Sequence, residues 1–489
     1  MAELKVISGG TQTMIRVEPG VRIADALRAN GFSIVSPCGG RGICGKCAVM
    51  LDGAVSDPGL SELKAGVRLA CQAVVLGDAE VILPREHVME GIELGSGSLS
   101  APAPMEGRYG AAVDIGTTTI ALNLYDLQNG EFLYRCGIPN PQRSVAADVM
   151  SRIGAAMAGS SGLLQDQVCA AVNTLLAQSC SIAGIDPSLV ESMTVTGNTT
   201  MLYLLTGRDP SVLSHAPFTA DHLFDETLPI CGKKTYLPRC MHAFVGADIT
   251  CAVLASSMCR EKKTALLCDI GTNGEIALWK DGKLLVTSTA AGPAFEGAGI
   301  SCGCGSIRGA VDSVAVYRGE PVIHVIGGEE AIGICGSGLI DAVAAALELG
   351  IVDETGCMAQ EYLSLAPAVR LYGADIRAVQ LAKAAIAAGI ETLLDEADVR
   401  PEDIDVFYIA GGFGSHMNLK SAVAIGLFPE VLTSRAVPLG NAALYGAAQM
   451  LLDREAQEEG RKIAGLARHV SLGGNPRFNM NYMEHMMFL

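Results

Sequence analysis

Two stretches of similar sequence decide the fold of this chain: RYGAAVDIGTTTI (Arg108–Ile120) and TALLCDIGTNGEIA (Thr264–Ala277). Each is a run of buried-strand residues that ends in an aspartate and a glycine turn, after which hydroxyl residues lead into further β-type sequence. The two aspartates, Asp114 and Asp269, are separated by about the length of one domain. That period is too long for a solenoid repeat, so the sequence predicts two related lobes.

An aspartate at the end of a buried strand, followed by glycine and threonine, suits the binding of a Mg²⁺-phosphate group. Glycine lets the backbone approach the phosphates, backbone N–H groups and threonine hydroxyls donate hydrogen bonds, and the carboxylate meets Mg²⁺ directly or through water. We therefore predict that the two turns face each other and clamp the phosphates of a nucleotide between two lobes. The residues assigned to phosphate and Mg²⁺ are Asp114, Gly116, Thr117, Thr118, Asp269, Gly271, Thr272 and Asn273.

Three further segments follow the first turn in a fixed order: VGADITCAVLA (Val245–Ala255), IAGGFG (Ile409–Gly414) and GNAALYGAA from Gly440. With them the sequence resembles the acetate and sugar kinase/Hsp70/actin (ASKHA) superfamily, whose lobes are RNase H-like. The resemblance implies that Asp248 matches the catalytic base of sugar kinases, although an aspartate at a helix start is equally often a cap. The residues expected to flank adenosine are Gly336, Ser337, Gly338, Gly411 and Gly412, and Glu275 and Glu296 either join the site or satisfy buried backbone.

Four cysteines near the N-terminus lie in PCGGRGICGKC (Pro37–Cys47) and RLAC (Arg68–Cys71). Three closely spaced thiolates on a glycine-rich loop and one distant thiolate are typical of a [2Fe–2S] cluster. A zinc site usually shows two closely spaced pairs, and only one such pair is present here. The first gap resembles that of adrenodoxin-like ferredoxins, so a β-grasp ferredoxin domain is predicted. Its cluster ligands would be Cys38, Cys44, Cys47 and Cys71.

The chain of 489 residues is too long for one core. We predict an α/β protein with an N-terminal β-grasp [2Fe–2S] ferredoxin domain and a two-lobed ASKHA ATPase. The predicted division is a ferredoxin-like domain over 1–86, a flexible Gly/Ser/Pro-rich linker over 87–107, a first lobe over 108–263 and a second lobe over 264–489.

Composition excludes several classes of partner. The net charge of −17 argues against nucleic acid, because nothing offsets repulsion by phosphates. The sequence has no apolar stretch long enough to span a bilayer and no signal-peptide pattern at its start, so we expect no membrane association. The 16 cysteines at irregular spacing fit a reducing compartment, which predicts a cytoplasmic protein.

Motifs along most of the chain narrow the resemblance to one family. GNTTM (Gly197–Met201), AGPAFEG (Ala291–Gly297) and GICGSGLIDA (Gly333–Ala342), together with the ferredoxin-like start, resemble the reductive activators of corrinoid proteins. The resemblance implies an ATP-hydrolysing metalloreductase that passes one electron from its cluster to the inactive Co(II) corrinoid of a methyltransferase or O-demethylase corrinoid protein, which regenerates Co(I). It also implies an upstream reductase or ferredoxin as donor and leaves room for a homodimer. Longer members carry an additional linking domain where this chain has only a short linker.

Other interpretations stay open at this point. The protein could donate electrons to another low-potential enzyme, such as a 2-hydroxyacyl-CoA dehydratase, or it could be a small-molecule kinase with a redox-sensing ferredoxin domain. Cys302 and Cys304 could be a redox or metal pair, although two small thiols packed in a glycine loop are the commoner arrangement.

Overall fold

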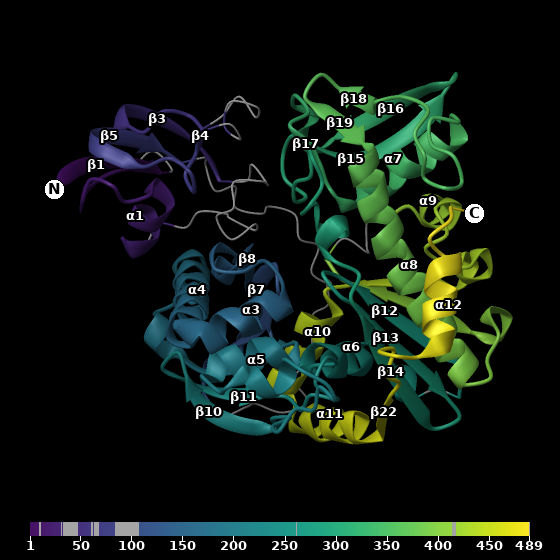
Figure 1. Cartoon of the computed structure of the whole chain (residues 1–489). Helices are drawn as coiled ribbons and strands as arrows, with labels where there is room; N and C mark the ends of the chain where they lie inside the picture. Colours follow the sequence, from purple (N-terminus) through teal and green to yellow (C-terminus); the bar gives the residue numbers. More distant parts are fainter. Residues whose placement is uncertain are drawn as a thin grey trace.

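The computed structural model describes residues 1–8, 11–30, 32, 47–59, 62, 68–83, 107–260, 262–412 and 417–488 (Figure 1). Cys38, Cys44 and nearly all of the predicted linker therefore lie outside the described residues.

The N-terminal domain contains a five-stranded sheet in the order β2-β1-β5-β3-β4, and among its described residues the short helix α1 packs against this sheet. Strand β1 pairs antiparallel with β2 and parallel with β5, which gives the mixed sheet of a β-grasp fold. The helix buries Ile23 and Leu27 against the strands, where Leu4 and Val6 are also fully buried. The bounds are β1 Ala2–Ser8, β2 Thr11–Val17, α1 Ile23–Ala29, β3 Ala48–Val55, β4 Arg68–Leu69 and β5 Val75–Ile82.

The first lobe is built on a six-stranded sheet in the order β10-β11-β9-β6-β7-β8. Strands β6, β7 and β8 form an antiparallel meander, while β9 and β11 continue the sheet in parallel. The bounds of the strands are β6 Tyr109–Ile115, β7 Thr119–Asp126, β8 Phe132–Pro139, β9 Val190–Gly197, β10 Glu226–Ile230 and β11 Lys233–Leu237. Its helices are α3 Val149–Ala155, α4 Ser161–Ala183 and α5 Thr199–Thr206.

The second lobe has a six-stranded sheet in the order β21-β20-β12-β13-β14-β22, which repeats the order of five strands of the first lobe. The sixth strand differs, because β22 lies beside β14 whereas β10 lies beside β11. Strands β12, β13 and β14 again form an antiparallel meander, and β20 and β21 continue it in parallel. The repeated aspartate turns therefore belong to equivalent hairpins, which confirms the prediction of two related lobes. The bounds are β12 Ala265–Ile270, β13 Gly274–Lys280, β14 Lys283–Thr289, β20 Val406–Ala410, β21 Ala436–Gly440 and β22 Ala467–His469.

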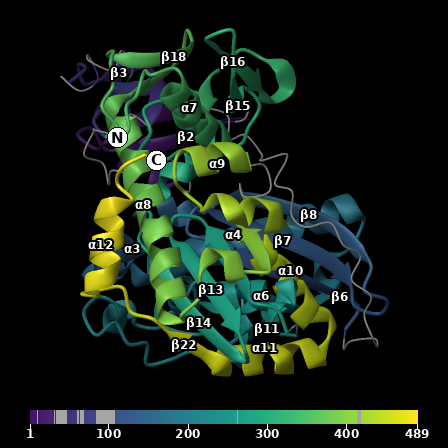
Figure 2. The same cartoon turned by 90° about the vertical axis from the view of Figure 1, so that its right-hand side faces the viewer.

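Further helices and two small sheets cover the second lobe (Figure 2). Helix α12 lies beside the long helix α8 in both views. The helices are α7 Gly336–Glu348, α8 Gly373–Glu396, α9 Leu419–Ala424, α11 Arg454–Leu466 and α12 Pro476–Glu484. The small sheets consist of β15 Ala310–Tyr317, β16 Glu320–Val325 and β17 Gly333–Ile334, and of β18 Tyr362–Ala366 and β19 Val369–Tyr372.

Two helices, α6 (Ala247–Ser256) and α10 (Ala442–Leu452), pack against each other between the lobes (Figure 1). A hydrophobic cluster joins them to strands of both sheets, with Ala112 of β6 and Leu267 of β12 among its fully buried members. Gly446 lets the two helices come very close, because a Cβ atom there would lie 2.0 Å from the carbonyl oxygen of Cys251. The two helices therefore pack against the strands of both lobes that lead into the hairpin turns.

None of the helices within the described part of the chain has the length and apolar character required to cross a bilayer.

Candidate functional site: a carboxylate cluster between two hairpin turns

Each aspartate turn is closed by a backbone hydrogen bond from its glycine, although the second turn is one residue shorter than the first. The N–H of Gly116 donates to the carbonyl of Thr119 at 2.9 Å, and the N–H of Gly271 donates to the carbonyl of Asn273 at 3.0 Å. A Cβ atom at Gly116 would lie 2.8 Å from that same carbonyl oxygen of Thr119, so this turn requires glycine. In each lobe the aspartate is the penultimate residue of its strand, and the turn glycine follows two positions later.

Hydroxyl groups of the two turns meet across the gap between the lobes. The Oγ1 atoms of Thr118 and Thr272 lie 3.2 Å apart. Both hydroxyls donate to one carboxylate oxygen, Oε2 of Glu296, and the distance from Thr272 is 2.8 Å. The structure thus brings together the two predicted phosphate loops.

Three aspartates of the prediction gather at this gap. Desolvation raises the pKa of Asp114 to about 6. A hydrogen bond from Nδ2 of Asn441 to the carboxylate, at 2.9 Å, partly opposes this rise. Desolvation, and then the charges of Asp114 and Glu296, raise the pKa of Asp269 to about 7. For Asp248, desolvation and the other two aspartates raise the pKa to about 8.

Glu275 adds a fourth acid, because it faces Asp269 across the β12–β13 hairpin. Its side chain is buried, and desolvation together with Asp248 and Asp269 raises its pKa well above the ordinary value. Clustered carboxylates that repel one another are the oxygen donors that a divalent cation neutralises. One or two of these carboxylates, together with phosphate oxygens and water, fit Mg²⁺, and the two threonine-bearing turns fit the phosphates that accompany it.

Asp248 lies in the first turn of α6, where the backbone N–H of Ile249 donates to its Oδ1 at 2.8 Å. The preceding Gly246 is packed tightly against the start of α5, since a Cβ atom there would lie 2.5 Å from Cα of Asn198. This packing fixes the helix start beside the aspartates. Asp248 thus makes a local backbone hydrogen bond and also belongs to the cluster, and its role as a catalytic base stays a prediction.

A buried arginine supports the first turn and was missed by the sequence analysis. Arg152 of α3 is 0% exposed, and its Nη2 donates to the carbonyl of Thr117 at 2.5 Å. Its other nitrogens donate to the Gln142 side chain, the Ala146 carbonyl and the Met201 sulfur. Desolvation lowers the pKa of Arg152 to about 9. No local sequence signal marks it, because an arginine on a short helix usually faces solvent.

Of the residues expected to flank adenosine, Gly411 lies at the cluster. Its φ is +102°, and a Cβ atom there would lie 3.0 Å from Oδ1 of Asp269. Gly412 follows it on the surface. The Gly336–Gly338 segment instead starts α7, where it is buried against backbone. The hydroxyl of Ser337 donates to the carbonyl of Asp312 at 2.9 Å. A role for these five residues at adenosine stays a prediction.

Two of the four predicted cluster ligands lie in described residues, and both are in the core of the N-terminal domain. Cys47 and Cys71 are 1% and 2% exposed. Strands β3 and β4 pair Ala48 with Leu69, and the N–H of Ala70 donates to the carbonyl of Cys47 at 2.9 Å, which draws the two segments together. The third and fourth predicted ligands therefore lie on adjoining segments of the domain core, which fits one shared [2Fe–2S] cluster.

Cys302 and Cys304 lie in a tightly packed glycine loop. A Cβ atom at Gly297 would lie 2.3 Å from the carbonyl of Cys304, and one at Gly333 would lie 2.8 Å from its sulfur. The Cys302 sulfur lies 3.5 Å from the carbonyl of Ala368. Among the described residues, no group of three or more His, Cys, Asp or Glu side chains has the geometry to hold a metal ion unaided.

Comparisons with known proteins match the three parts of the chain separately. A family model described as the 2Fe-2S iron-sulfur cluster binding domain matches residues 6–76. A model of the RACo middle region matches residues 109–261, and one of the C-terminal ASKHA domain of RACo matches residues 263–489.

Several known proteins are similar to this chain over most of its length. The corrinoid activation enzyme RamQ of Eubacterium limosum is 33% identical over 78% of this chain and 70% of its own length. The [Co(II) methylated amine-specific corrinoid protein] reductase of Methanosarcina barkeri is 26% identical over 78% and 77%. A solved structure of a reductive activator for corrinoid, iron-sulfur protein aligns with a TM-score of 0.73 and 26% identity, and it covers 99% of this chain and 98% of its own.

Proposed function

The chain belongs to the family of corrinoid activation enzymes, and from that premise we propose that it is an ATP-dependent reductive activator. It passes one electron from its [2Fe–2S] cluster to the inactive Co(II) corrinoid of a methyltransferase or O-demethylase corrinoid protein, and Co(I) is regenerated. The observation that carries this proposal is the convergence of Asp114, Asp248 and Asp269 between two lobes of a chain that also buries Cys47 and Cys71 together.

The energetics explain why the electron transfer needs ATP. A plant-type [2Fe–2S] cluster supplies one electron at about −400 mV, and Co(I) is harder to form than that potential allows. A gap of about 180 mV costs roughly 4 kcal/mol for one electron, since each ~59 mV corresponds to a factor of ten. A ligand that binds one conformation more tightly than another can offset a cost of this size.

Residues of the two hairpin turns would couple ATP to the arrangement of the lobes. Thr117 and Thr118 belong to the first lobe and Thr272 to the second, so a phosphate held by both turns links the lobes directly. The aspartates would hold Mg²⁺, and Gly411 would leave room for the adenosine beside Asp269. Closure of the lobes on ATP would then alter the surface that meets the corrinoid protein.

Several finer assignments belong to the same proposal. An upstream reductase or ferredoxin refills the cluster, and the protein works in the cytoplasm, where 16 cysteines suit a reducing environment. A homodimer is compatible with this scheme. We propose residues 1–86, 87–107, 108–263 and 264–489 as the functional units.

Anaerobic absorbance spectroscopy tests the proposed function. Chemically pre-reduced protein is mixed with a Co(II) corrinoid protein, and the Co(I) spectrum should appear only when Mg·ATP is present. The variant Asp114→Asn should keep its cluster spectrum and lose the ATP-dependent reduction. Asp281→Asn is the matched control, because Asp281 is exposed in the β13–β14 turn of the second lobe.

Two outcomes would contradict the proposal. Reduction that survives unchanged in Asp114→Asn would show that the carboxylate cluster does not couple ATP to the electron. Absence of Co(I) with several corrinoid proteins, despite an intact cluster signal and ATP hydrolysis, would assign the electron to another low-potential acceptor, such as a 2-hydroxyacyl-CoA dehydratase.

A further inference from the structure

One carboxylate spans the two hairpin turns at the position expected for a phosphate. Oε2 of Glu296 accepts hydrogen bonds from Thr118 of the first lobe and Thr272 of the second. A carboxylate and a terminal phosphate both present anionic oxygens that accept from hydroxyl groups. In this structure the glutamate therefore uses the same two donors that the sequence assigns to phosphate.

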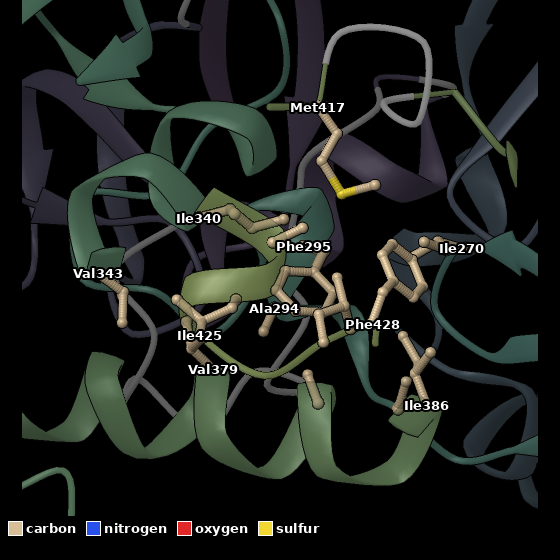
Figure 3. Packing of buried hydrophobic residues seen from close by; sticks show 14 of the residues in the cluster. Ile270, Ala294, Phe295, Ile340, Val343, Val379, Ile386, Met417, Ile425 and Phe428 are labelled. Carbon is tan, nitrogen blue, oxygen red and sulfur yellow. The ribbon is translucent and has the colours of Figure 1, made fainter. Parts of the chain in front are cut away.

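The backbone that carries Glu296 is anchored on both sides. Glu296 ends a short 3₁₀ helix, Pro293–Glu296, whose Ala294 and Phe295 are 5% and 1% exposed. Figure 3 shows these two side chains packed among residues of α7, α8 and the 417–428 segment, including Ile340 and Ile386. Gly297, with φ of +74°, follows and packs against the backbone of Cys304. With its backbone held in this way, Glu296 can leave the threonines only by rotation of its side chain.

A cation of the first lobe interacts with Glu296. Arg143 stands just after β8 in the first lobe, and its guanidinium interacts electrostatically with Glu296. Desolvation lowers the pKa of Arg143, because the side chain is largely removed from water. A desolvated guanidinium gains from an anion, whether that anion is the carboxylate or a phosphate.

We propose that Glu296 is a built-in competitor for the terminal phosphate of ATP: it bridges Thr118 and Thr272 in the nucleotide-free protein and is displaced when a triphosphate binds. This inference rests on the proposed function, since it takes ATP as the nucleotide. In the nucleotide-free protein the Glu296 carboxylate connects the two lobes, and in the bound protein the terminal phosphate connects them instead. Glu296 thereby makes the contact between lobes depend on which nucleotide is bound.

Two anions cannot share the same pair of donors without repulsion, so the charge of Glu296 should weaken triphosphate binding in the native protein. A glutamine at the same position keeps an oxygen that can accept from the threonines, but it carries no charge. The variant Glu296→Gln should therefore bind a triphosphate more tightly and leave the binding of a monophosphate unchanged, because AMP does not reach the two threonines.

Isothermal titration calorimetry of the full-length protein with AMP, ADP and a non-hydrolysable imido analogue of ATP, each with Mg²⁺, tests this inference. We expect Glu296→Gln to bind the triphosphate analogue about tenfold more tightly than the native protein, or 1.4 kcal/mol. Its affinity for AMP should change by less than about twofold. Glu330→Gln is the matched control, since it removes one charge from an exposed position of the same lobe.

Hydrogen exchange gives a second readout that does not depend on nucleotide. In the nucleotide-free protein, Glu296→Ala should speed amide exchange in the two hairpin turns, because it removes the bridge between Thr118 and Thr272. Once the triphosphate analogue is bound, the exchange rates of the two turns should be the same in Glu296→Ala and in the native protein, because the ligand then bridges the turns in both. Unchanged exchange elsewhere in the second lobe would show that the variant is folded.

Two results would overturn the inference. Weaker binding of the Mg²⁺-triphosphate by Glu296→Gln would make Glu296 a group that assists the bound nucleotide, and identical binding would show that its charge does not compete. Failure of the native protein to bind any nucleotide would instead overturn the proposed function, and the two failures are therefore distinguishable.

Discussion

Replacing Gly446 by alanine would force apart the two helices that support the site. In the structure a Cβ atom at this position would lie 2.0 Å from the carbonyl oxygen of Cys251 and 2.5 Å from its carbonyl carbon. Ordinary contact begins at 3.4 Å, so α10 and α6 would have to separate by roughly 1.4 Å. Both contacts are with backbone, which no side-chain rotation can relieve.

The magnitude follows from two opposing effects. Overpacking a well-packed core costs about 1–3 kcal/mol, and a clash of this depth with backbone belongs at the upper end of that range. Alanine in a helix gains about 0.5–1 kcal/mol over glycine. We therefore expect Gly446→Ala to lower the free energy of unfolding of the two-lobed part by about 2 kcal/mol.

Gly465→Ala is the matched control, because Gly465 is a glycine of α11 with no atom within 4 Å of a Cβ. It should show only the favourable effect of alanine. Differential scanning calorimetry at one scan rate compares the two variants with the native protein. The cluster absorbance should not change in either variant, since the ferredoxin domain has a separate hydrophobic core.

Nucleotide binding should weaken along with stability in Gly446→Ala. Asn441 caps the start of α10 and donates to Asp114 at 2.9 Å, and a displacement of more than 1 Å breaks a hydrogen bond of that length. A Gly446→Ala protein that is as stable as Gly465→Ala and binds Mg·ATP normally would refute this account of the helix contact.

Four further predictions concern the cation, the pH dependence of stability, the buried arginine and the cluster. The pKa values of the three clustered aspartates are raised to between about 6 and about 8, so Mg²⁺ binding at pH 7 should displace protons from them and should become tighter as the pH rises from 6 to 8. Calorimetry in two buffers of different ionisation enthalpy measures the number of protons released. Mg²⁺ binding without proton release would contradict this prediction. Without Mg²⁺, the free energy of unfolding should decrease as the pH rises from about 4 to about 8, because these aspartates lose their protons near pH 4 in the unfolded chain but keep them to higher pH in the folded protein. Denaturation at several pH values with and without Mg²⁺ checks the sign. Arg152→Met should cost about 3 kcal/mol by removing the arginine donors from the Thr117 and Ala146 carbonyls, which thermal unfolding would reveal, and an unchanged melting temperature would argue against the buried network. Cys71→Ser should abolish the [2Fe–2S] absorbance, whereas the exposed Cys357→Ser should retain it, and equal spectra would remove Cys71 from the ligand set.

Local patterns sufficed for those parts of the site that short segments encode. A strand, an aspartate, a glycine turn and threonines occur within a dozen residues, so the sequence predicted both hairpins and their threonines. The meeting of Thr118 with Thr272 was expected from the repetition of the lobes. The four cysteines were assigned to one cluster by spacing in the same way, and this assignment stays a prediction.

Residues that act across long sequence separations were missed or left undecided. Asn441 reaches Asp114 from the start of a helix more than three hundred positions away, and Arg152 reaches Thr117 from a different helix. Neither contact leaves a local pattern. Glu296 was noted but left undecided, because a glutamate beside glycines satisfies buried backbone as often as it meets a ligand, and only the packed lobes show that it faces two hydroxyl groups.

The repetition of the two sheets also has an evolutionary meaning. Two identical lobes related by a two-fold axis would present equivalent aspartates to one ion, as a homodimer of a single ancestral lobe would have done. Asp114 and Asp269 preserve that equivalence, but the helices beneath them do not, because α6 carries Asp248 in its first turn where α10 begins at Asn441. A symmetric ancestor could hold a nucleotide in two opposite orientations, whereas the present chain distinguishes one side of its ligand from the other.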